Sequence, residues 1–135
     1  MGIFEALKEM NDEPNFKKVD NGLFESMVED VEIKEGVFET EIKISYIIVT
    51  PGKSEGGKIT QWFKIKEDDS ANDKKMRFIQ WQVKAITGLE TLKDADLLQA
   101  LANSRGNLVE IEVSTHEYNG KNYQGVTVKN FVKGN

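Results

Sequence analysis

Strict alternation of apolar and polar side chains is the feature that most constrains this fold. In the segment Lys58–Lys66, KITQWFKIK, the residues alternate between core-type side chains and polar ones, with Trp62 in the polar set. Successive side chains of a β-strand point to opposite faces, so this spacing predicts a strand with one buried face. A second segment, Val37–Val49, predicts the same, with Glu39 and Glu41 on its polar face. Its expected buried positions are Phe38, Thr40, Ile42, Ile44, Tyr46 and Ile48.

Three further segments have strand patterns. Gly22–Lys34 alternates with a phase slip near Val28–Val31, which indicates a β-bulge or a sharp coil. Leu108–Tyr118 and Lys121–Val132 flank the dipeptide Asn119-Gly120, a strong signal for a two-residue hairpin turn. The sequence therefore predicts five strands, the last two of them joined as a hairpin.

After Glu67 the period changes from that of a strand to that of a helix. Apolar residues recur at helical spacing and the pattern stops at Gly88, while the preceding DDSAND sequence supplies N-cap residues. The expected core positions of this helix are Met76, Ile79, Val83 and Ile86. These residues predict a helix between the third and fourth strands.

Two shorter helices are also expected. One opens with a capping arrangement of Thr91 and Asp94 and carries its apolar residues at Leu97, Leu98 and Leu101. The other covers residues 2–11 and is followed by a polar linker. The N-terminal helix is expected either to pack on the domain or to contact another subunit.

The resulting order is three strands, a helical insert and two strands. This is the chain order of the five-stranded OB-fold, a small Greek-key barrel, although a β-sandwich or an α+β roll shares it. A chain of 135 residues suits one domain. We expect an all-β OB-fold domain over residues 20–135, preceded by a helix and linker over residues 1–19.

The charge distribution matters more than the total charge. The formal net charge is −5, which argues against a simple basic nucleic-acid binder, yet residues 51–90 carry a net charge of +2. The chain has no cysteine, and its first residues resemble neither a secretory signal nor a membrane span. These features predict a cytoplasmic protein that does not associate with membranes.

Residues suited to catalysis are sparse. His116, the single histidine, lies in a predicted strand with no nucleophile nearby in sequence. Acidic residues cluster around Glu29 and again around Asp68, but no third ligand stands at a metal-binding spacing. We therefore expect no enzyme activity, no cofactor and no metal site.

Binding of single-stranded nucleic acid is better supported. Such binding uses aromatic side chains that stack on bases and cations that contact phosphates, and one strand face here supplies both. That face carries Lys58, Thr60, Trp62 and Lys64. Alternatively, Trp62 packs beneath the helical insert and the lysines are its solvent-facing neighbours.

Further candidate contacts come from three other segments. Lys43 is expected beside Trp62, on a face where Glu39 and Glu41 would repel phosphate. The hairpin turn is flanked by Tyr118 and Tyr123, with Lys121 between them, and each tyrosine serves either packing or stacking. On the helix, Arg77 and the lysines before it could reach phosphate. Its aromatic residues are expected in the core; these are Phe78 and Trp81.

Several of these segments together resemble a known family. AITGLETLKDADLLQALANSRGNLVEIEV and EYNGKNYQGVTVKNF, together with GLFESMVEDVEIKEG and FETEIKISYIIV, resemble small phage single-stranded DNA-binding proteins. The resemblance covers roughly residues 20–132. It implies an OB-fold, sequence-independent coating of single-stranded DNA, dimerisation, and a recombinase or replication protein as a partner.

One feature departs from related single-strand binders. The chain ends VKNFVKGN, which contains no acidic residue, whereas cellular and some phage members end in an acidic tail that recruits partners. Any partner is then expected to dock on the barrel or on the N-terminal helix.

Two other functions remain open on sequence alone. The same barrel can serve as a protein-interaction or assembly module without nucleic acid, in which case another chain covers Trp62. A metal enzyme based on carboxylates is the third reading, with Asp68 and Glu29 as the residues to test.

Overall fold

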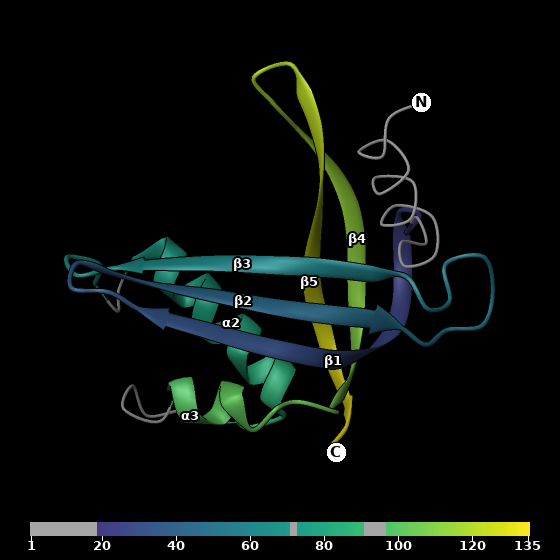
Figure 1. Ribbon diagram of the computed structural model, residues 1–135, viewed down its shortest axis with the longest axis horizontal. Coiled ribbons are helices and arrows are strands. Elements are labelled where there is room, and N and C mark those ends of the chain that lie inside the picture. The colour runs from purple at the N-terminus through teal and green to yellow at the C-terminus, as the bar shows by residue number, and fades with distance from the viewer. Residues whose placement is uncertain (1–18, 71–72, 91–96) are drawn as a thin grey trace, which may run out of the picture.

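The computed structural model describes residues 19–70, 73–90 and 97–135. The expected helix at residues 2–11 and the expected cap at Thr91 and Asp94 lie outside the described residues. The described residues form one five-stranded antiparallel sheet and two helices (Figure 1). None of the helices in these ranges is long and apolar enough to span a lipid bilayer.

The strands occupy the segments that alternation predicts. They are β1 (Gly22–Glu35), β2 (Glu39–Ile48), β3 (Lys58–Lys66), β4 (Leu108–Tyr118) and β5 (Lys121–Lys133). Their order across the sheet is β3-β2-β1-β4-β5, and every neighbouring pair is antiparallel. The mostly-β class is confirmed. The sheet is open, because β3 and β5 are its two edges and no backbone ladder joins them.

Strand β1 belongs to both halves of the sheet. Its first part, Gly22–Met27, pairs with β4, and its later part pairs with β2. The register slips between Val28 and Asp30, at the predicted phase slip. A bulge increases local twist and bends its strand. In Figure 1 β1 accordingly runs beside β4 and then turns to run beside β2.

The core lies between the inner face of the sheet and α2 (Lys74–Thr87). Inward residues of β2, including Ile42 and Tyr46, are fully buried, as the alternation predicts. Phe38 contradicts its predicted burial, since 73% of its surface is exposed. The reason is that β2 begins only at Glu39, so Phe38 lies in the preceding turn, where alternation no longer sets its direction.

A network of buried polar side chains bridges the open seam between β3 and β5. The Tyr46 hydroxyl donates to Gln61 Oε1 (2.7 Å), and Gln61 Nε2 donates to the Val126 carbonyl (3.2 Å) and to Gln82 Oε1 (2.7 Å). Gln82 also bonds both backbone groups of Val128, at 2.9 and 2.8 Å. Burial raises the pKa of Tyr46 well above its ordinary value, so its hydroxyl remains a donor. Side-chain amides thus satisfy strand-edge groups that a closed barrel would pair through its backbone.

The caps and turns follow local chemistry with one difference. Gly88 ends α2 in the left-handed region (φ 75°), as predicted. Asp73 is the N-cap residue of α2, but its carboxylate accepts from the Ser70 N–H (2.9 Å) and bonds no helical N–H. Positive φ values at Asn119 (53°) and Gly120 (75°) fit a type I′ turn. A second helix, α3 (Leu97–Ala102), buries Leu97 and Leu101.

The tip of the β4–β5 hairpin stands away from the rest of the sheet (Figure 1). Every residue from Thr115 to Gln124 whose side chain is described is exposed. Its base is held by the side chain of Gln124, which donates to the Val19 carbonyl (2.7 Å) and the Asn21 side chain (3.2 Å). The hairpin is therefore an arm fixed at its base.

Candidate functional site

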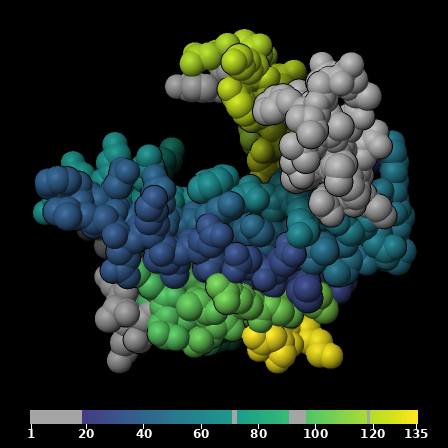
Figure 2. Space-filling view, viewed as in Figure 1, coloured from purple at the N-terminus to yellow at the C-terminus, as the bar shows by residue number. Residues whose placement is uncertain are grey.

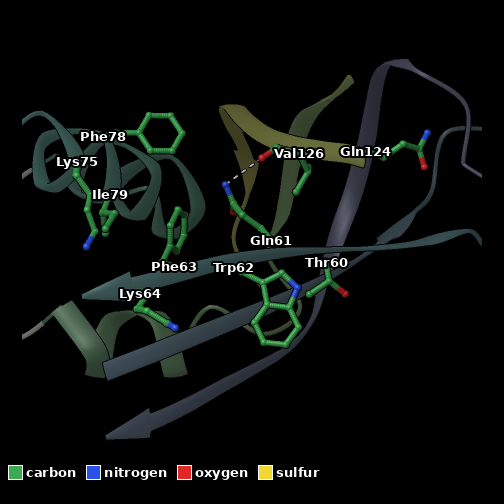
Figure 3. Close-up of a pocket in the computed structure, with 11 residues that line it drawn as sticks. Thr60, Gln61, Trp62, Phe63, Lys64, Lys75, Phe78, Ile79, Gln124 and Val126 are labelled. Carbon is green, nitrogen blue, oxygen red and sulfur yellow. Dashed lines mark hydrogen bonds between the residues drawn. The ribbon is translucent and has the colours of Figure 1, made fainter. Parts of the chain in front are cut away.

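Trp62 is exposed on the outer face of β3, as predicted. The side chains on either side of it in the strand, Gln61 and Phe63, point into the core, while 63% of the Trp62 surface is accessible. The alternative prediction, in which Trp62 packs beneath the helical insert, is wrong. The indole projects from the outer face with Thr60 and Lys64 on the same face (Figure 3).

A cleft of about 420 Å³ lies beside Trp62. Residues of β3, of the first turns of α2 and of β5 line it (Figure 3). Figure 2 shows the surface hollowed between the projecting hairpin and the body of the molecule. The lining residues are Thr60, Gln61, Trp62, Phe63, Lys64, Lys75, Phe78, Ile79, Gln124, Gly125 and Val126. The cleft therefore lies between the edge strands β3 and β5, which no backbone ladder joins. Aromatic rings and ammonium groups stand at its rim.

Two aromatic residues of α2 contradict their predicted burial. Phe78 is 41% exposed and Trp81 is 44% exposed. The buried stripe of α2 runs through Ile79, Val83 and Ile86, and each helical residue is rotated by about 100° from the one before it. Phe78 therefore lies on the flank of the helix, whereas Trp81 lies nearer the side opposite the buried stripe. A helical projection centred on the apolar stripe is the signal that would have placed them outside the core.

The aromatic rings form a continuous row. Phe63 and Phe78 meet edge-on with their ring centroids 6.4 Å apart, and Phe78 and Trp81 do the same at 5.7 Å. Such T-shaped pairs are a favoured arrangement of aromatic rings. The row leads from the floor of the cleft to the outer side of α2.

The lysines around Trp62 are paired with carboxylates. Lys58 Nζ lies 2.8 Å from Glu29, and Lys64 Nζ lies 3.7 Å from Glu39 and 3.6 Å from Glu41. Strand register produces part of this pairing, because Glu41 stands directly opposite Lys64. The prediction that glutamates share this face is confirmed.

Lys43 lies beside Trp62, as predicted. It stands opposite Trp62 in the β2–β3 register, its Nζ is 5.2 Å from the ring centroid, and it is 4.0 Å from Glu32. A cation over an indole face is attracted by the ring quadrupole. Exposed ion pairs contribute only about 0–1 kcal/mol, so these lysines can exchange partners, but the carboxylates stay on the face and repel phosphate.

Lys75, at the cleft rim, is also paired. Its Nζ donates to Asp69 Oδ2 (2.6 Å), which also accepts from the Lys66 N–H (2.7 Å). The hydrogen bond from Lys75, and next the one from the Lys66 backbone, lower the pKa of Asp69 below its ordinary value of 3.8. Asp69 therefore holds Lys75, which lines the cleft, through a hydrogen-bonded ion pair.

The hairpin residues predicted as contacts belong to β4 and β5, beside the turn at the tip of the arm. Lys121 and Tyr123 are exposed on the arm, and neither lines the cleft. Tyr118 lies in β4 and its side chain is outside the described part of the structure. His116 is exposed and its Nε2 lies 3.0 Å from Ser114 Oγ. The cleft contacts that sequence reasoning did not identify are Gln124 and Gly125, at the base of the arm.

Carboxylates of the cluster around Glu29 form ion pairs. Glu29 pairs with Lys58, and Asp30 pairs with Arg105 at 3.0 Å. Within residues 19–70, 73–90 and 97–135, no group of three histidine or acidic side chains is placed to hold a metal ion. The cluster around Glu29 thus partners cations, and in the cluster around Asp68 the neighbouring Asp69 pairs with Lys75.

No model of a protein family matches this sequence, and no curated protein matches it either. The resemblance to phage single-stranded DNA-binding proteins therefore stays a prediction.

Proposed function

We propose that this protein binds single-stranded DNA without sequence preference, at the cleft between β3, α2 and β5. We also propose that its sheet is an OB-type barrel. The order β3-β2-β1-β4-β5 supports this, because joining its two edges would give the five-stranded Greek-key arrangement. In that barrel the seam is closed by α2 and the Gln61–Gln82 network instead of a backbone ladder.

The observation that carries the proposal is the exposed indole of Trp62 at the rim of a cleft that also contains Phe78. A large exposed aromatic surface beside a concave site is typical of a binding site. A base stacked on an aromatic side chain contributes about 1–3 kcal/mol. Two such rings and a few phosphate contacts give useful affinity, and stacking tolerates every base because each has a π-face.

The biological setting follows from the resemblance. We place the activity in phage DNA replication or recombination, in the cytoplasm of the host cell. The protein then acts as a homodimer beside a recombinase or replication protein.

Anisotropy titration of a labelled oligothymidylate tests the proposal. Wild-type protein should bind the single strand more tightly than duplex DNA, and the affinity should fall steeply as salt rises. Trp62→Ala should weaken binding by about 10- to 100-fold, the equivalent of one stacked base. Phe38→Ala is the matched control, since it removes an exposed ring from a turn outside the cleft lining and should change little.

Equal binding by wild-type and Trp62→Ala proteins would contradict the site. An unchanged signal with oligothymidylates of every length at low salt would contradict the function.

A second function is favoured by the ion pairs around Trp62. Because Lys58 and Lys64 both have carboxylate partners, this face resembles a neutralised protein-interaction surface more than a basic groove. An assembly module predicts that another chain covers Trp62. Trp62→Ala would then lower the molar mass measured by light scattering, whereas the double variant Lys58→Glu, Lys64→Glu would leave it unchanged.

A further inference from the structure

Four residues of α2 form one exposed stripe, which we call the α2 outer face: Lys74, Arg77, Trp81 and Lys84. Their spacing of three, four and three residues places them on one side of a helix. The opposite side of α2 is buried against the sheet through Ile79, Val83 and Ile86. The α2 outer face therefore cannot be explained as part of the core.

The charge on this face differs from that around Trp62. Helix α2 carries four cations and no acidic residue. The three cations of the α2 outer face make no ion pair with any residue in the described ranges. In a chain with a net charge of −5, a stripe of unpaired positive charge is unusual and attracts anions over several ångströms.

The α2 outer face continues directly from the cleft. Phe78 lines the cleft, and its ring meets Trp81 at a centroid distance of 5.7 Å. From Lys74 to Lys84 the helix extends for about 15 Å, because each residue adds 1.5 Å. A strand that leaves the cleft past Phe78 would therefore meet a second indole and three cations.

We propose that the α2 outer face is a second binding segment for the same single strand. Trp81 stacks on a base, and Lys74, Arg77 and Lys84 contact the phosphates. This inference rests on the function proposed above and moves the main phosphate contacts from the β3 lysines to the helix. The cleft binds the first bases. Helix α2 supplies unpaired positive charge for the phosphates, whereas the charge of the lysines around Trp62 is offset by carboxylates.

A cationic helix with aromatic residues can also bind an anionic membrane surface. That mode requires a broad apolar face that inserts between lipids. Here the aliphatic face of α2 is covered by the sheet, and its exposed large apolar side chains are Phe78 and Trp81, which are 41% and 44% exposed. Nucleic acid is therefore the favoured ligand.

Salt-dependent titration of a triple variant tests the inference. Lys74→Gln, Arg77→Gln and Lys84→Gln together remove three phosphate contacts. The slope of log affinity against log salt should then fall in magnitude by about 2, since each contact on a single strand contributes about 0.7. At low salt the affinity for a 20-nucleotide oligothymidylate should fall by about tenfold or more.

A matched triple variant controls for net charge. Lys53→Gln, Arg105→Gln and Lys129→Gln change the total charge equally, but at exposed side chains paired with Asp20, Asp30 and Glu112, outside the cleft. Its salt slope should remain close to that of the wild-type protein. Thermal unfolding of both variants checks that each is folded.

The length of the oligonucleotide separates the two segments. For wild-type protein, affinity should rise between about 5 and about 20 nucleotides, and the α2 triple variant should lose most of that gain.

Equal salt slopes for the α2 triple variant, its control and the wild-type protein would overturn the inference while leaving the proposed function intact. If the wild-type protein binds no single-stranded DNA, the inference and the proposed function are both contradicted. The inference would also be overturned if the wild-type protein and the control bind phosphatidylserine vesicles while the α2 triple variant does not, and DNA binding is the same for all three. The α2 outer face would then bind a membrane surface.

Discussion

Trp62 on β3 and Trp81 on α2 are two exposed indoles among cations, yet their surroundings differ in charge. Around Trp62, glutamates of β1 and β2 pair with Lys43, Lys58 and Lys64. Around Trp81, the helix itself contributes only cations. The difference arises because the lateral neighbours of a strand residue come from other strands, whereas those of a helix residue come from its own sequence three and four positions away.

The comparison shows in which elements a lysine without a carboxylate partner can be predicted from the sequence. A lysine in an alternating strand is partnered by whatever the register places opposite it. A lysine in a helix without acidic residues has no carboxylate partner unless another element brings one close to it. For the proposed function, the Trp81 side is therefore better suited to phosphate contacts, and the Trp62 side is better suited to base stacking beside a cleft.

The largest expected effect comes from Gln82, which fixes α2 and its Trp81 side to the sheet. Gln82→Leu leaves the buried N–H and carbonyl of Val128 without their partners. Each unsatisfied buried group costs about 1–3 kcal/mol, so the free energy of unfolding should fall by about 3 kcal/mol. Urea denaturation measures this change.

Gln80→Leu is the control for that experiment. Gln80 lies on the same helix, is half-buried and makes no hydrogen bond to the described residues, so its replacement should change stability by less than about 0.5 kcal/mol. Equal midpoints for the two variants would show that the amide network does not hold the seam.

The next effect distinguishes the two indoles by oligonucleotide length. Trp81→Ala should weaken binding of long oligothymidylates by about 1 kcal/mol, the lower end of the range for a stacked base, because Trp81 is only partly exposed. It should leave pentanucleotides unaffected, whereas Trp62→Ala weakens both. If Trp81→Ala lowers the affinity for short and long oligonucleotides equally, Trp62 and Trp81 belong to one binding surface and the distinction between them is wrong.

A smaller effect tests whether the carboxylates limit the Trp62 side. Glu41→Gln removes a charge 3.6 Å from Lys64 Nζ. Affinity for single-stranded DNA should rise by about 0.5–1 kcal/mol, because Lys64 loses one of its two carboxylate partners and one repulsion of phosphate is removed. Glu112→Gln, which releases Lys129 on the other half of the sheet, should give no such gain. A weaker affinity for Glu41→Gln would contradict the charge argument.

The smallest effect concerns Lys75, the one cation of α2 that the structure pairs. NMR titration of the Asp69 carboxyl should give a pKa below 3.8, and Lys75→Met should move it back towards that value. Lys74→Met, on the unpaired side, should not. Because the folded pKa is lowered, this contact stabilises the fold at pH values above 3.8 and is lost as the pH falls through the lowered pKa. A pKa of Asp69 at its ordinary value in the wild-type protein would contradict the contact with Lys75.

The sequence by itself determined the local elements. Alternation over Lys58–Lys66 gave β3 its bounds and placed Trp62 outward, and the slip at Val28–Val31 marked the bulge. Asn119-Gly120 gave the hairpin turn and Gly88 the end of α2. These features are local because backbone conformation and side-chain direction depend on residues a few positions apart.

Only the tertiary structure decided which residues meet. It paired the lysines around Trp62 with glutamates and brought Gln124 and Gly125 to the cleft. It also placed Phe78 and Trp81 at the surface and left the sheet open, with Gln61 and Gln82 across its seam. Register, helix rotation and edge closure depend on packing between segments far apart in the chain, and no local pattern carries that information.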